Sequence, residues 1–137
     1  MNPVAAWLAL GSNLGDRQGY LSFARSQIAA TAGLSLRRAS AVEETAPLDG
    51  SDQPAYLNQM LLVETTLSAG ALLAVCHTVE RLAGRERSQK WAARTLDIDL
   101  VRYDSLLCDL PELVLPHPGL RDRPFWAREI AMVEAYV

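Results

Sequence analysis

The stretch RTLDIDL, residues 94–100, decides how this chain is expected to fold and where its chemistry lies. Residues two apart on a strand point to the same face, so Asp97 and Asp99 share one face and the apolar residues share the other. The apolar face predicts a core strand, and the acidic face predicts a small, densely charged site. Two carboxylates this close repel each other unless a cation lies between them, and Mg²⁺ takes such oxygen ligands together with substrate phosphates. The alternative is a solvated acidic face on a half-buried strand, and the neighbouring residues decide between the two.

Basic residues gather just before this stretch, in a chain whose formal net charge is -3. Five of the 13 lysine and arginine residues lie there: Arg81, Arg85, Arg87, Lys90 and Arg94. Because the planar guanidinium group makes two parallel hydrogen bonds to phosphate, cations beside a carboxylate pair predict a site for a polyphosphate and its metal ion. Taken alone, the cluster fits equally well a solvated loop that pairs with Glu80 and Glu86.

Several common signatures are missing from the sequence. It contains neither a G-x-x-x-x-G-K-[ST] loop nor a G-x-G-x-x-G turn, so side chains and metal would have to hold the phosphates. The run GSNLGD, residues 11–16, predicts a strand-to-helix turn with Asp16 as the helix N-cap. Cys76 and Cys108 form no disulfide or metal-thiolate pattern.

The bulk composition is that of an ordinary globular protein. With 137 residues, of which 50% are hydrophobic and 21% charged, residues 1–137 are expected to form one domain. No apolar run approaches the roughly 20 residues that span a bilayer, and no signal-peptide pattern is present. The acidic total argues against nucleic acid as a partner. A cytoplasmic location, without membrane association, is therefore expected.

The order of predicted elements indicates an α+β, ferredoxin-like βαββαβ sandwich, with an antiparallel sheet covered by two helices. Strands are predicted at residues 4–10, 34–44, 56–67 and 97–103, and helices at 16–32 and 68–83, with Ser68 as the second N-cap. Turn-forming residues predict a loop over residues 46–55. A proline-rich tail follows from Asp109, with a last short helix from about Phe125.

Five segments, in this order and spacing, resemble the 6-hydroxymethyl-7,8-dihydropterin pyrophosphokinase family of folate biosynthesis. They are LALGSNLGD (8–16), DQPAYLN (52–58), GRER (84–87), RTLDIDL (94–100) and LPHPGLRDRPF (115–125). The resemblance covers about residues 7–126. It implies a magnesium-dependent pyrophosphokinase, which transfers the pyrophosphoryl group of ATP to the hydroxymethyl oxygen of the reduced pterin and leaves AMP.

The resemblance also implies roles on the ATP side of the site. Asp97 and Asp99 would hold two Mg²⁺ ions along the triphosphate, and Arg85 and Arg94 would contact phosphates and the developing charge. These four are the expected catalytic residues. Residues that match ATP-binding positions are His77, Arg87, Lys90, Arg94, Leu100, His117 and Arg123.

On the pterin side, Tyr56 and Phe125 match aromatic residues that sandwich the ring, and Asn58 matches a side chain that hydrogen-bonds its edge. Thr45 and Leu48 match a loop whose backbone contacts the same edge, and Trp91 matches an aromatic residue that helps to close the site. A flat ring with amide edges needs aromatic faces and a few fixed hydrogen bonds in its plane, which agrees with these matches. Without the resemblance, Tyr56 and Phe125 would be taken as ordinary core residues.

Some positions depart from the family pattern. His77 stands in place of a glutamine, Lys90 in place of an arginine, Pro118 in place of a tyrosine, and Ala92-Ala93 in place of Gly-Pro. The C-terminus is shorter than usual, which is expected to leave an apolar flank for a partner subunit, so a monomer or a weak homodimer is expected. The alternative functions are a catalytically weak paralogue that binds a pterin or nucleotide, and a domain used only in assembly. The retained carboxylate pair favours the enzyme.

Overall fold

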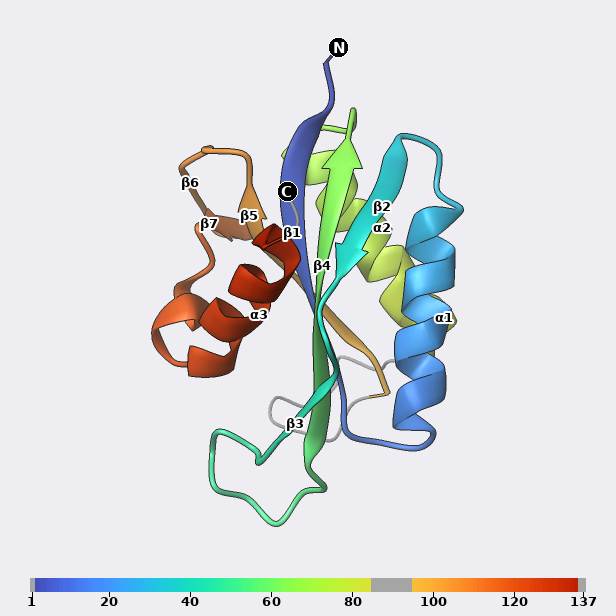
Figure 1. The fold of residues 1–137 in the computed structure, drawn as a ribbon, viewed down its shortest axis with the longest axis vertical. Helices are drawn as coiled ribbons and strands as arrows, with labels where there is room; N and C mark the ends of the chain where they lie inside the picture. The colour runs from blue at the N-terminus through green and yellow to red at the C-terminus, as the bar shows by residue number, and fades with distance from the viewer. Residues whose placement is uncertain (1, 85–94, 136–137) are drawn as a thin grey trace.

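The computed structural model describes residues 2–84 and 95–135, and within them five strands form an antiparallel sheet (Figure 1). Strand β1 (Val4–Ser12) lies between β4 (Tyr56–Thr65) and β5 (Asp97–Tyr103), while β2 (Leu34–Ala39) and β3 (Glu43–Thr45) pair with the other side of β4. Helix α1 (Arg17–Ala29) follows β1, and α2 (Ala69–Leu82) follows β4. The predicted α+β, ferredoxin-like order is confirmed.

Both predicted helix starts are confirmed by side-chain caps. Asp16 accepts a hydrogen bond from the Gly19 amide at 3.0 Å, and Ser68 accepts one from the Ala71 amide at 3.1 Å. Such caps satisfy amide groups that have no partner within the helix. The first helix ends at Ala29, three residues before the predicted position.

The strand predicted over residues 34–44 is divided into β2 and β3, and Ser40 explains the break. The Ser40 amide donates to the Met60 carbonyl and its hydroxyl accepts from the Met60 amide, both at 2.9 Å. The Ser40 hydroxyl oxygen therefore takes the place of a backbone carbonyl as the acceptor for the Met60 amide. The strand pairing shifts register between Leu36 and Arg38 and resumes in β3.

The sheet is covered on both faces, which differs from the predicted two-helix cover. Helices α1 and α2 pack on one face around residues such as Leu8, Leu61 and Leu100. Helix α3 (Pro124–Glu134) packs on the other face, where Met60 and Val101 contact its apolar residues, and it lies across the sheet from α1 and α2 in Figure 1. The short terminal helix was predicted, but its role as a third layer was not.

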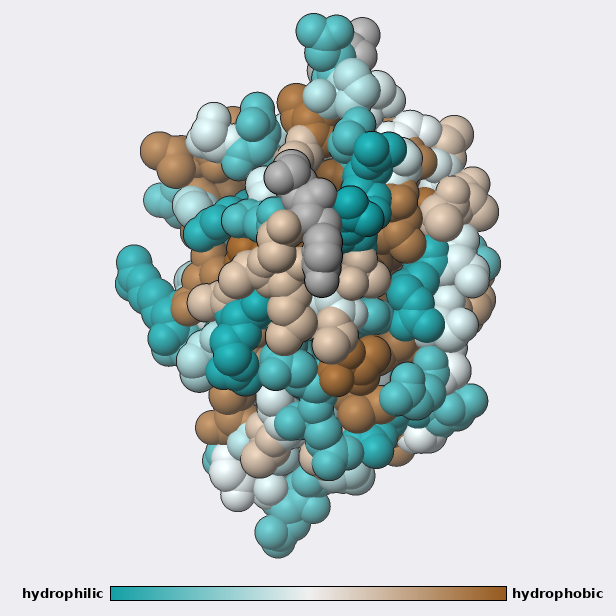
Figure 2. Space-filling model, in the orientation of Figure 1, coloured by the Kyte–Doolittle hydropathy of each residue, from teal (hydrophilic) through white to brown (hydrophobic). Residues whose placement is uncertain are grey.

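The proline-rich tail before α3 contains structure that the sequence did not predict. Strands β6 (Cys108–Leu110) and β7 (Leu113–Leu115) form a hairpin, and the 3-10 helix η1 (Pro118–Arg121) follows it. Hydrophobic residues gather near the hairpin on the face drawn in Figure 2. Leu110 and Val114 of the hairpin are exposed, and so is Leu107 just before it. Among the described residues, no helix has the length and apolar character to cross a bilayer.

Candidate active site

The candidate site occupies the part of the α3-side sheet face that α3 leaves uncovered. On each central strand, residues on this face change from apolar under α3 to polar or small beyond it: Met60 gives way to Asn58 and Tyr56, and Ala9 to Gly11. On β5 the same change runs from Val101 to Asp99 and Asp97. Strands β4 and β5 therefore place polar groups together, on either side of the small Gly11 of β1, at one end of a face whose other end is core.

Strand β5 shows the side-chain alternation predicted from RTLDIDL. Ile98 and Leu100 are each 2% exposed and belong to the core under α1 and α2, whereas Asp97 and Asp99 are partly exposed on the opposite face. Leu100 was matched to an ATP-binding position; its side chain is in the core, although the residue also borders a cavity described below.

A buried glutamate on α2 holds the backbone between the two aspartates. Glu80 Oε2 accepts a hydrogen bond from the Ile98 amide at 2.8 Å, and Glu80 is 2% exposed. This hydrogen bond is buried and ties the backbone of β5 to α2. Sequence reasoning placed Glu80 with the basic loop and missed this role. The available signal was its position on the apolar face of the helix, together with Leu72, Cys76 and Val79.

His117 reaches Asp99 from the start of η1. Its amide donates to the Val101 carbonyl at 2.9 Å, which ties it to β5, and its Nδ1 accepts from the Gly119 amide at 2.9 Å. Because Nδ1 accepts, the ring proton lies on Nε2, and Nε2 is 3.6 Å from Asp99 Oδ1. His117 therefore presents an N–H donor beside the carboxylate pair.

Arg123 is positioned by an aromatic ring. Its guanidinium carbon lies 4.9 Å from the centroid of the Trp126 ring. The same ring makes an edge-on contact with His117, with 5.1 Å between the two centroids. A Cβ atom at Gly119 would come within 2.9 Å of Trp126 and 3.0 Å of His117 Nδ1. A glycine is needed there because any side chain would displace this group, which aims one cation and one histidine at the acidic pair.

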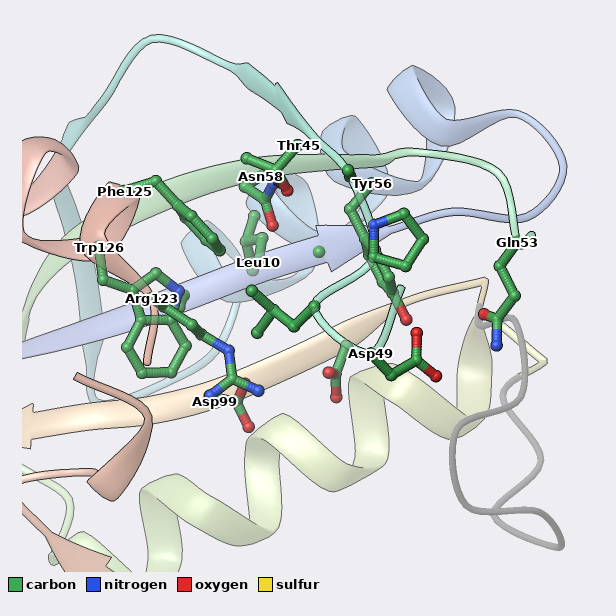
Figure 3. Close-up of a pocket in the computed structure, with 16 residues that line it drawn as sticks. Leu10, Thr45, Asp49, Gln53, Tyr56, Asn58, Asp99, Arg123, Phe125 and Trp126 are labelled. Carbon is green, nitrogen blue, oxygen red and sulfur yellow. Dashed lines mark hydrogen bonds between the residues drawn. The ribbon is translucent and has the colours of Figure 1, made fainter. Parts of the chain in front are cut away.

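Eight of the predicted site residues line one cavity of about 250 Å³. They are Thr45, Leu48, Tyr56, Asn58, Asp97, Asp99, Arg123 and Phe125. Figure 3 shows Phe125 and Tyr56 at opposite sides of this cavity, with Asn58 and Thr45 between them. The Asn58 amide donates to the Thr45 hydroxyl at 2.7 Å, so the polar edge between the aromatic residues is held in one orientation.

The loop at residues 46–55, which forms one wall of this cavity, is fastened by residues of the GSNLGD turn and α1. Asn13 is 1% exposed and its Nδ2 donates to Gln53 Oε1 at 3.1 Å and to the Pro54 carbonyl at 3.3 Å. Arg17 Nη1 donates to the Ala55 carbonyl and to Glu44 Oε2, both at 2.9 Å. The sequence predicted only a turn and a cap here; the buried asparagine is a further fastening that it did not reveal.

A second cavity of about 290 Å³ lies between α2, β5 and the β6–β7 hairpin. His77 and His117 border it, and so do Asp97 and Asp99, which therefore stand between this cavity and the first. Within the described part of the chain, no group of three or more metal-binding side chains is present. A carboxylate pair with one histidine suits a hard cation whose remaining ligands come from substrate phosphates and water. Arg85, Arg87, Lys90, Trp91 and Arg94 lie outside the described residues.

Fold and site together define an α+β protein whose acidic pair, Asp97 and Asp99, lies between two cavities. The first cavity has aromatic walls, and the second is the polar cavity beside α2. The family model of 7,8-dihydro-6-hydroxymethylpterin-pyrophosphokinase matches residues 7–135, and the chain belongs to this family. This confirms the resemblance seen in the sequence.

Curated relatives agree with the family assignment. The chain is 38% identical over 120 residues to the 2-amino-4-hydroxy-6-hydroxymethyldihydropteridine pyrophosphokinase of Methylorubrum extorquens, covering 88% of this chain and 76% of that protein. It is 32% identical over 133 residues to the protein of the same name from Bacillus subtilis, covering 97% and 79%. The Haemophilus influenzae protein of that name is 34% identical over 122 residues, covering 89% and 76%.

Proposed function

We propose that this protein transfers the pyrophosphoryl group of ATP to the hydroxymethyl oxygen of 6-hydroxymethyl-7,8-dihydropterin. The observation that carries the proposal is the position of Asp97 and Asp99, which border the aromatic-walled cavity and the polar cavity at once. A pterin in the first cavity and a triphosphate in the second would meet at this pair. Family membership supports both substrates.

In the first cavity, Tyr56 and Phe125 would stack on the two faces of the pterin ring, and Asn58 would hydrogen-bond its edge. Stacking and edge recognition fix the hydroxymethyl group near the acidic pair, so binding energy is converted into orientation. Leu48, which is exposed at the cavity mouth, would cover the ring when the substrate binds.

In the second cavity, the protein would orient the triphosphate for in-line attack. The pterin hydroxyl oxygen forms a bond to the β-phosphorus, the bond from that phosphorus to the bridging oxygen of the α-phosphate breaks, AMP leaves, and the hydroxyl proton passes to water. His117 would donate its Nε2 proton to a phosphate oxygen, and Arg123 would contribute positive charge. Arg85 and Arg94 keep the phosphate-contacting roles that the resemblance implies.

Asp97 and Asp99 would hold Mg²⁺, two ions on the family pattern, which would neutralise phosphate charge as the β-phosphorus is attacked. Oxygen donors on one strand face, next to a cavity with room for phosphates, fit this ion. A module that only binds a pterin would not need such a pair, so the weak-paralogue alternative has no observation in its favour. A single domain, a cytoplasmic location and a monomer or weak homodimer remain predictions.

The test is an assay for AMP formation with purified protein, ATP, the hydroxymethyl pterin and Mg²⁺. Product is expected only when all are present, and Asp97→Asn should lower turnover about a hundredfold or more, because one oxygen donor to the cation is lost. Asp109→Asn, on the exposed β6 strand, is the matched control and should retain activity. AMP formed without the pterin, or pterin binding with no AMP, would refute the proposed reaction.

A further inference from the structure

A second pair of acidic side chains, Glu43 and Glu129, lies on the α3 side of the sheet. Glu129 is on α3, one turn after Phe125, and is 0% exposed. Glu43 begins β3, two residues before Thr45, and its register partner on β4 is Asn58. The pair therefore joins the helix that carries one aromatic wall of the first cavity to the strand that carries its polar edge.

The described residues supply this pair with too few hydrogen-bond donors for two carboxylates. Both side-chain oxygens of Glu129 and Oε1 of Glu43 are buried and have no donor in the described part of the chain. Arg128 directs its Nε and Nη2 to the remaining oxygen, Glu43 Oε2, each at 3.4 Å. Because a buried carboxylate without donors is very unfavourable, one of the two acids must keep its proton and donate it to the other.

The surroundings of Glu129 identify which acid is protonated. Burial, then the hydrogen bond to Glu43 and the Glu43 charge, raise the pKa of Glu129 to about 9, and Arg128 opposes the shift. The other elements packed on α3 present apolar residues to it: Ala9 on β1, Met60 and Leu62 on β4, Val101 on β5 and Leu120 on η1. Glu129 is therefore the neutral acid, and Glu43, paired with Arg128, is the acceptor.

We propose that Glu129 and Glu43 share a proton and thereby lock α3 to β3, which sets the position of Phe125 relative to Asn58 and Thr45 for the pterin ring. This inference rests on the proposed function, since it assigns the pterin to that cavity. The two glutamates are positioning residues, because neither lines the cavity. With the shared proton present, a hydrogen bond joins the two elements. Without it, the fully buried Glu129 and the partly exposed Glu43 carry like charges that repel, and α3 is pushed from β3.

The decisive variant is Glu129→Gln. Glutamine has the same length and can donate an N–H to Glu43, but it cannot ionise. We expect near wild-type KM for the pterin in this variant at pH 7.5. As pH rises to 10, the ratio of wild-type KM to variant KM for the pterin should increase severalfold, with the KM for ATP changed less than twofold in both proteins. Taking the ratio cancels titration of the substrate and of other residues.

Glu129→Ala removes the donor at every pH, so its KM for the pterin should rise about tenfold at pH 7.5, if the protein folds. Glu134→Gln, on the exposed side of the same helix, is the matched control and should follow the wild type at every pH. A pH-independent ratio between the wild type and Glu129→Gln would overturn the proposal, and so would an unchanged KM for the pterin in folded Glu129→Ala.

A measurement without ligand separates this inference from the proposed reaction. Hydrogen exchange of α3 amides, relative to α1 amides of the same molecule, should accelerate between pH 8 and pH 10 in the wild type and stay constant in Glu129→Gln. If AMP is not formed but this difference is seen, the reaction is wrong and the lock is real. If AMP is formed and the exchange ratios of the two proteins do not differ, the lock is refuted.

Discussion

Two acidic pairs lie on the same side of the sheet, and they relieve like-charge repulsion in different ways. Asp97 and Asp99 are partly exposed, stand beside a histidine N–H and face two cavities. Glu43 and Glu129 meet between packed elements, where Glu129 has no contact with solvent. An open pair can take a cation from solution, whereas Glu129, which solvent does not reach, keeps its proton instead. On the proposed roles, access to water, more than the presence of two carboxyl groups, would decide which pair serves chemistry and which serves structure.

The largest effect is expected when one member of the open pair is neutralised, which tests whether the two pairs really differ in role. Asp99→Asn is expected to lower turnover about a thousandfold, because the proposed mechanism would lose half of the negative charge that holds the cation at the phosphates. The free energy of unfolding should stay equal or rise slightly, because repulsion in the absence of ligands is relieved. AMP formation and urea unfolding would be measured together. Wild-type turnover in Asp99→Asn would mean that the open pair, like the buried one, is only structural.

The buried pair predicts a pH dependence of stability with a definite sign. The unfolded chain releases the Glu129 proton near the ordinary pKa of 4.5, whereas the folded protein keeps it up to about pH 9. Between these values the unfolded state binds fewer protons, so the free energy of unfolding falls as pH rises, by at most about 1.4 kcal/mol per pH unit. Above about pH 9 this contribution no longer changes.

Urea unfolding of the wild type and Glu129→Gln at pH 6, 7 and 8 isolates that contribution. The variant should gain stability over the wild type at each step, by about 1 kcal/mol per unit, because glutamine has no proton to lose. Repeating the series with Glu134→Gln, whose side chain is exposed, should give no such trend. Parallel stability curves for the wild type and Glu129→Gln would show that Glu129 is charged in the folded protein.

Glu80 offers a contrast to Glu129, since it is a buried glutamate that accepts a backbone hydrogen bond. Replacing it with leucine leaves the Ile98 amide without this acceptor and should cost about 2 kcal/mol of stability. Turnover should fall about tenfold, because the backbone between the two aspartates is no longer held to α2 and their side chains shift. Glu80→Gln keeps an acceptor oxygen and should lie closer to the wild type in both measurements. Equal losses in the two variants would assign the effect to charge instead of to the hydrogen bond.

Local patterns in the sequence were sufficient for much of this architecture. The alternation in RTLDIDL, the caps at Asp16 and Ser68 and the loop at residues 46–55 depend on near neighbours in the chain, and the structure confirms them. The resemblance gathered residues from distant segments, and those within the described part of the chain do line the cavities. The division of one predicted strand at Ser40 was missed because it depends on a hydrogen bond to Met60 on another strand.

The missed site features have the same origin. Glu80 meets Ile98, Asn13 meets Gln53, and Glu43 meets Glu129 only after the chain has folded. In each case a polar side chain is buried by packing that joins distant segments. A glutamate on the apolar side of a helix is the one visible sign in the sequence, at Glu80 and again at Glu129. Such a residue signals a buried partner, but the sequence does not say which residue that partner is.

The smallest expected effect concerns the rim of the buried pair. Arg128 is 56% exposed in its side chain and pairs with Glu43 at 3.4 Å, so Arg128→Ala should cost less than about 1 kcal/mol of stability at pH 7. Its charge also favours ionisation of Glu129, so removing it should move the loss of pterin affinity to higher pH. The KM for the pterin, measured from pH 8 to 10, tests this direction. A shift to lower pH would mean that Arg128 stabilises the shared proton by holding Glu43 in place, which makes its hydrogen bonds more important than its charge.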